Sequence, residues 1–236
     1  MTGRVDDPTD TAADTFADRP DRAAELRPVL AEAAASVLEL VGSPEVGREW
    51  NQPSALDGMT VGGLAAHVIG ALRMVLVLLA RERPDTDVVA TPFAFFGDNR
   101  REGPSADDER SRLIAATAEE GAAEGQAEVV DELTSVMAQV DATLAEQPAD
   151  TTMATSRIPD AVCRLDDYLL TRLAEVVLHG DDLAASVGVV WHPPSRAAGA
   201  TIDLLVDMTR ERVGDLEVLR ALAREERSSP GVLRAL

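Results

Sequence analysis

The chain has 236 residues, of which 42 are acidic and 22 are basic, and its formal net charge is −20. Nucleic-acid-binding proteins take much of their affinity from Lys and Arg side chains that contact phosphates, so a chain with a pI near 4.4 would repel DNA or RNA over most of its surface. Aromatic residues make up only 3% of the chain, which disfavours an all-β fold. The abundant Ala, Leu, Glu and Arg predict instead an all-α protein that binds no nucleic acid.

The N-terminal segment and the cysteine content bear on domain organisation and compartment. Residues 1–20 are rich in Asp, Thr and Ala without a helical repeat, so we expect a disordered acidic tail followed by a single helical domain over residues 21–236. No apolar run near the start has the length of a signal peptide. The only cysteine, Cys163, excludes an intrachain disulfide, and an inert buried thiol is favoured over a nucleophile. We therefore expect a cytoplasmic protein.

The first predicted helix covers Arg22 to Val41, where apolar residues recur every three or four positions, and it ends at Gly42. Residues 44–58 have the composition of a loop. Thr60 then serves as the N-cap of a second helix that runs to about Arg83.

The apolar stretch from Val61 to Ala80 in this second helix is long enough to cross a bilayer. It contains His67 and Arg73, which are costly in lipid, and no second such stretch exists to shelter them. A buried bundle helix is favoured over a membrane span.

The second half of the chain continues the helical pattern. A long connection over residues 84–105 contains three phenylalanines and the pair Arg100-Arg101, for which a solvated loop is favoured over a role in steering anions. The remaining elements are expected as follows: a helix from about Ala106 to Ala145, loosened near Gly121 and Gly125; a loop from Pro148 to Cys163; a helix from Leu165 to Val187, ended by Gly188; a short strand over 187–191; and a helix from Ser195 to Arg227. The sum is a four-helix bundle with long crossover loops and an additional C-terminal helix.

The placement of the three histidines narrows the search for a site. His67 has only apolar residues beside it at helical spacing, whereas His192 lies in a predicted loop and is left out. A histidine on an apolar helix face is either a core residue that hydrogen-bonds the backbone or a ligand, and both interpretations stay open here.

One polar stripe runs along the predicted helix from Leu165 to Val187. At about 100° per residue, five side chains share this stripe: Tyr168, Arg172, Glu175, His179 and Asp182. Apolar residues cover the rest of the helix, more than a surface helix needs, so we expect the stripe to face an internal cavity. Taken alone, Glu175 and His179 at i and i+4 are also compatible with an exposed pair on a solvated face.

The residue types in these two helices are those of a metal centre. Two histidines and one glutamate form a three-ligand set for catalytic zinc that leaves a position open. His67, Glu175 and His179 are the candidate ligands, and Arg172 and Asp182 are candidates for orienting them. Spacing alone leaves a metal centre and a structural role about equally open, because it does not show that the two helices meet.

Two segments resemble a known family. The run from Leu56 to His67, LDGMTVGGLAAH, and the run from Arg172 to Leu183, RLAEVVLHGDDL, are similar to the two metal motifs of the mycothiol-dependent maleylpyruvate isomerase N-terminal domain family, within the DinB-like superfamily. The segment from Gly214 to Arg224 also resembles its members. The chain departs from the family at Met59, where Trp is common, and we expect no counterpart of the isomerase's separate C-terminal domain in residues 1–236.

The resemblance implies a DinB-like bundle in which His67, Glu175 and His179 hold a divalent metal, zinc above all, with Ni²⁺ or Fe²⁺ as alternatives. It also implies a low-molecular-weight thiol, mycothiol, as cosubstrate for S-transfer to, or isomerisation of, a small electrophile. The competing hypothesis is a non-catalytic metal-binding bundle or interaction module, because many superfamily members have no demonstrated activity. The electrophile and the oligomeric state, monomer or homodimer, stay open.

Overall fold

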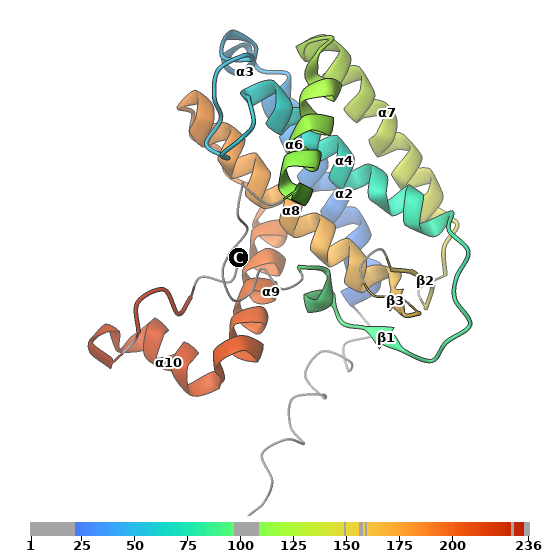
Figure 1. The fold of residues 1–236 in the computed structure, drawn as a ribbon, viewed down its shortest axis with the longest axis vertical. Coiled ribbons are helices and arrows are strands. Elements are labelled where there is room, and N and C mark those ends of the chain that lie inside the picture. Colours follow the sequence, from blue (N-terminus) through green and yellow to red (C-terminus); the bar gives the residue numbers. More distant parts are fainter. Residues whose placement is uncertain are drawn as a thin grey trace, which may run out of the picture.

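The computed structural model describes residues 22–96, 109–148, 150–155, 158, 160–227 and 229–233. Figure 1 shows a helical bundle, which confirms the all-α, DinB-like fold. The long bundle helices are α2 (Arg22–Val41), α4 (Val61–Leu79), α7 (Gln126–Ala145) and α8 (Leu165–Val187). The predicted acidic tail over residues 1–20 and the pair Arg100-Arg101 lie outside the described residues.

Helices α4 and α8 form the centre of the bundle. Helix α8 packs against both α2 and α4, and α4 also packs against α7 and the shorter α6 (Glu109–Ala122). Leu165, Leu169 and Leu173 of α8 are completely buried, and so are Leu64 and Leu78 of α4. Burying one such side chain stabilises the fold by roughly 1.5–3 kcal/mol, so these two helices carry much of the packing free energy.

Among the residues that the structure describes, helix α4 is the one helix long and apolar enough to cross a membrane. Its most apolar 18-residue stretch has a mean hydropathy of 1.9, and 67% of that stretch is buried inside the bundle. Thr60 caps its N-terminus, where the Oγ1 atom accepts a hydrogen bond from the backbone N–H of Gly63 at 3.0 Å. The N-cap prediction is therefore confirmed, and the burial supports the interpretation of α4 as a core helix.

Side chains from neighbouring helices donate hydrogen bonds to carbonyls at and just beyond two helix ends. Gln126 donates from its amide nitrogen to the carbonyls of Val41 and Ser43, at 2.6 and 2.7 Å. Arg27 donates to the carbonyls of Leu144 and Gln147, each at 2.8 Å. The last carbonyls of α2 and α7 have no partners within their own helices, so these contacts couple the helix ends to one another.

The third and last predicted helices are both divided in the structure. The third breaks into α6 and α7 around Gly125, which has φ +98°, close to where loosening was expected. The continuous helix expected from Ser195 to Arg227 is wrong: α9 (Ser195–Val213) ends at Gly214, and α10 (Asp215–Ala223) and the 3-10 turn η3 (Glu225–Arg227) follow. Gly214 has φ +84°, a conformation that an L side chain resists, so the helix cannot continue through it.

Short elements account for the other corrections. The strand expected over 187–191 is wrong, since α8 continues to Val187 and no strand follows it among residues 188–194. The predicted loops instead contain α3 (Pro44–Arg48), β1 (Val89–Ala90), η2 (Pro92–Phe95), β2 (Thr152–Ala154) and β3 (Val162–Arg164). β3 lies between β1, its parallel neighbour, and β2, its antiparallel neighbour. Strands of two or three residues are too short to produce a detectable alternation in sequence.

Candidate metal centre

His67 projects from the second turn of α4, and two close contacts position the turn before it. A Cβ atom at Gly62 would lie 2.5 Å from the indole of Trp50, and one at Gly63 would lie 2.2 Å from Glu119 of α6. The Trp50 indole in turn donates to the carbonyl of Ala122 at 3.2 Å. A side chain at Gly62 would collide with the Trp50 ring, and one at Gly63 would displace the Glu119 carboxylate, so the two glycines let α4 approach both neighbours and help to set where the imidazole of His67 enters the bundle.

Glu175 and His179 lie one turn apart on α8, which is held by a similar close contact one residue later. A Cβ atom at Gly180 would lie 2.6 Å from the Trp191 ring, whose indole N–H donates to Ser36 Oγ of α2 at 3.1 Å. The tryptophan therefore fixes the rotation of α8 relative to α2. With that rotation fixed, the polar stripe of α8 faces α4.

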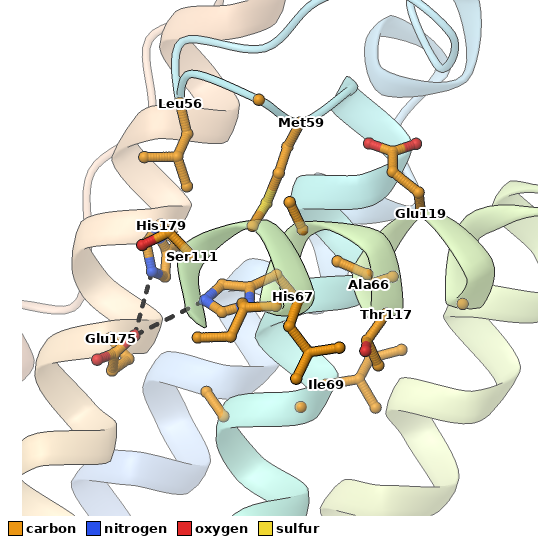
Figure 2. Close-up of a pocket in the computed structure, with 18 of the residues that line it drawn as sticks. Leu56, Met59, Ala66, His67, Ile69, Ser111, Thr117, Glu119, Glu175 and His179 are labelled. Carbon is orange, nitrogen blue, oxygen red and sulfur yellow. Dashed lines mark hydrogen bonds and ion pairs between the residues drawn. The ribbon is translucent and has the colours of Figure 1, made fainter. Parts of the chain in front are cut away.

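The three candidate ligands meet between α4 and α8, as Figure 2 shows. Glu175 Oε2 lies 3.1 Å from His179 Nε2 and 3.9 Å from His67 Nε2. The two imidazole rings meet edge to face, with centroids 4.8 Å apart. One donor atom from each of the three residues lies within 4.8 Å of the others. The structure thus brings together the residues that sequence spacing left unconnected.

The ionisable side chains of the cluster shift one another's pKa values. Burial alone would raise the pKa of Glu175, but hydrogen bonds with His179 and His67 and the charge of Arg172 hold it well below its usual range. Burial alone would lower the pKa of His179, but the hydrogen bonds and charges of Asp182 and Glu175 raise it to about 9. Glu175 is therefore ionised at neutral pH and offers a negatively charged oxygen to a cation.

Asp182 and Arg172 lie on either side of the three donors. Asp182 Oδ2 is 3.1 Å from His179 Nδ1, the ring nitrogen that faces away from Glu175. The guanidinium of Arg172 stacks 4.8 Å above the Tyr168 ring centroid, with Nη2 3.8 Å from Glu175 Oε1. By accepting the Nδ1 proton, Asp182 can orient His179 so that its Nε2 points to the donor cluster, where a bound cation would replace the Nε2 proton; this is a common arrangement behind metal-ligating histidines.

A cavity of about 1140 Å³ opens beside the three donors. It lies between α4, α6, α8 and the loop over residues 55–59, and is large enough for a small organic ligand. Besides the ligand candidates, its lining includes Leu56, Met59, Ser111, Thr117 and Glu119. These residues were not predicted from the sequence. They lie in the loop over residues 55–59 and in α6, and no repeat in the sequence indicates that these two segments line the same cavity.

Two other residues weighed in the sequence lie away from this cavity. His192 is exposed in the segment after α8. Cys163 is completely buried in β3, and burial, with a smaller contribution from Asp167, raises its pKa to about 12. A thiol held protonated and away from solvent is a poor nucleophile, which supports its interpretation as a structural residue.

Residues 30–184 match the mycothiol maleylpyruvate isomerase N-terminal domain. The chain belongs to this family. The matched range includes His67, Glu175 and His179 and ends before α9 and α10. No curated protein and no solved structure matches the chain. The family match confirms the resemblance seen in the two sequence motifs.

Proposed function

We propose that this chain is a divalent-metal-dependent enzyme that joins a low-molecular-weight thiol, such as mycothiol, to a small electrophile for S-transfer or isomerisation. The convergence of His67, Glu175 and His179 beside a cavity carries the proposal. Family membership supports the thiol, because the family is named for mycothiol.

The donor set is close to that of a zinc-sized ion, which on binding would draw the three donors, now within 4.8 Å of one another, closer together. Ligand atoms about 2 Å from one tetrahedral ion lie roughly 3.3 Å from each other. The separations of 3.1 and 3.9 Å between Glu175 Oε2 and the two Nε2 atoms bracket that value. Two imidazoles and one carboxylate also leave a fourth position for substrate, and zinc is the metal that this set favours.

The chain's own residues prepare the site for this chemistry. Asp182 accepts the Nδ1 proton of His179 and so directs its Nε2 toward Glu175. Arg172 lies beside the other oxygen of Glu175 and limits its rotation. A bound divalent ion would supply the Lewis acidity that favours thiolate over thiol.

The reaction itself is a substitution or addition at carbon. The thiol loses its proton to water, and its sulfur then forms a bond to the electrophilic carbon. In S-transfer, the bond from that carbon to the leaving group breaks. In isomerisation, the sulfur adds to one carbon of a double bond and leaves after rotation about the resulting single bond, which regenerates the thiolate.

Metal analysis of the purified full-length chain tests the ligand assignment. We expect about one equivalent of divalent metal in the wild type and loss of that metal in the His67→Ala, His179→Ala double variant. His192→Ala is the matched control, because this histidine is exposed outside the cavity. Full occupancy in the double variant would refute the assignment.

Cobalt substitution tests the role of the thiol. Adding mycothiol to the cobalt-loaded chain should produce a thiolate-to-metal charge-transfer band, which is absent in the double variant. A metal-loaded chain that neither gives this band nor consumes thiol with a panel of electrophiles would favour the non-catalytic bundle instead.

A further inference from the structure

The loop over residues 54–59 is closed on itself by hydrogen bonds. The backbone N–H of Ser54 donates to the carbonyl of Met59 at 2.9 Å, and Pro53 and Thr60 pair as an isolated antiparallel bridge around it. Gly58 has φ +85°, the conformation that lets the chain turn back so tightly. The backbone of this loop is therefore held in place before any ligand enters.

The same loop is fastened to the two helices on either side of the cavity. The backbone N–H of Ala55 donates to Ser186 Oγ of α8 at 2.8 Å. Thr60 donates from its backbone N–H and its hydroxyl to the carboxylate of Glu119 in α6, at 2.6 and 2.9 Å. The loop thus bridges α6 and α8 beside the donor cluster.

Two apolar side chains of the loop extend into the cavity. Figure 2 shows Leu56 and Met59 reaching down from the loop toward His179 and His67, with Ile69 on the other side of the His67 ring. Leu56 and Met59 are each only half-buried, so part of their apolar surface remains uncovered. A ligand with an apolar group gains free energy by covering that surface.

The charged residues around this part of the cavity already have partners. Arg73 pairs with Glu132, and Glu119 accepts both hydrogen bonds from Thr60. Arg172 lies against Tyr168 and Glu175. The other charged lining residues, Asp57, Arg110 and Arg112, are exposed to solvent. A carboxylate placed against Leu56 and Met59 would lose hydration, and the buried His179 beside them is already paired with Glu175 and Asp182.

We propose that Leu56 and Met59 form a specificity wall, which makes the electrophile of this enzyme one with an uncharged alkyl or aryl group rather than a carboxylate. This inference rests on the proposed function for the chemistry and on the fastened loop for the selectivity. The alternative role of the wall is to exclude water from the donor cluster, which would affect all substrates alike.

Product-like ligands separate the two roles without turnover. The probes are S-benzyl mycothiol and S-(4-carboxybenzyl) mycothiol, titrated by calorimetry into the purified chain with its metal bound. We expect the benzyl conjugate to bind at least about tenfold more tightly, because the carboxylate is desolvated at the wall. In the Leu56→Ser, Met59→Ser double variant, the preference should fall to within roughly twofold.

Further variants keep the test independent of folding. Leu219→Ser, in the exposed face of α10, is the matched control and should change neither affinity. If circular dichroism shows that the double variant is unfolded, Met59→Gln, which keeps the side-chain length, should weaken the preference, and Met59→Leu should retain it.

Equal binding of the two conjugates by the wild type, no binding of either, or an equal loss of both affinities in a folded variant would each overturn the inference. Metal content is measured separately, so a chain that holds no metal refutes the proposed function while this binding result is still read on its own.

Discussion

Leucine side chains are buried in the bundle and exposed on helix α10. Leucines at 165, 169, 173 and 183 of α8 are completely buried, whereas Leu216, Leu219 and Leu222 of α10 are each about 60% exposed. Helix α10 buries only Val218 among its residues and lies apart from the bundle beyond α9 (Figure 1). The family match also ends before α9. The stability of the chain and its candidate site should therefore both depend on the bundle, with little contribution from α10.

Truncating one leucine in each region is the strongest test of this difference. Leu169→Ala leaves a cavity at a fully buried position and should lower the free energy of unfolding by about 2–5 kcal/mol. Leu219→Ala on α10 should change it by less than about 0.5 kcal/mol. Urea denaturation followed by circular dichroism measures both values. Similar losses in the two variants would show that α10 is as well packed as α8.

Asp167 and Asp215 should change the free energy of unfolding with pH in opposite directions. Burial raises the pKa of Asp167, at the start of α8, to about 6, despite the opposing charge of Arg164. A hydrogen bond from Arg210 lowers the pKa of the exposed Asp215, at the start of α10. The folded state thus binds the Asp167 proton more tightly than the unfolded chain, where an aspartate titrates near pH 3.9.

The contribution of Asp167 therefore favours folding most below about pH 4 and is lost as the pH rises through 6, by about 2–3 kcal/mol. Asp215 acts in the opposite direction, stabilising above its unfolded pKa and losing that contribution as the pH falls. Asp167→Asn should flatten the pH profile of stability between pH 4 and 6, as measured by urea denaturation at each pH. Carboxyl NMR that finds Asp167 titrating near pH 4 would contradict this account.

A smaller difference is expected for two arginines. Arg27 donates to carbonyls at the end of α7 and lies 3.6 Å from the buried Asp166, so Arg27→Met should cost about 2 kcal/mol. Arg220 pairs with Glu217 on the surface of α10, and Arg220→Met should cost less than about 1 kcal/mol. Thermal unfolding of both variants checks the order, and a larger loss for Arg220→Met would reverse it.

The bundle helices were predictable because short-range features of the sequence mark where each helix lies. The repeat from Leu26 to Val41, the cap at Thr60 and the stop at Gly188 are all short-range signals. The break at Gly214 was missed because a glycine inside a helical pattern is often tolerated, and the positive φ that ends the helix is set by the fold. The strands, of two or three residues each, left no periodicity to detect.

The three candidate ligands could be predicted from the sequence, but the packing that brings them together and the residues that line the cavity could not. Glu175 and His179 share a stripe by helical geometry alone, but their meeting with His67 depends on how α4 packs against α8. The close contacts at Gly62, Gly63 and Gly180 set that packing, and their partners lie outside the helices that contain these glycines. For the same reason the contribution of Leu56 and Met59 emerged only with the fold.

The most direct test of the central claim is anomalous diffraction from crystals of the zinc-loaded chain, collected on both sides of the zinc absorption edge. The account predicts one strong anomalous peak about 2 Å from His67 Nε2, His179 Nε2 and a carboxylate oxygen of Glu175. A peak bound to other side chains, or none at this position in crystals grown with excess zinc, would contradict it.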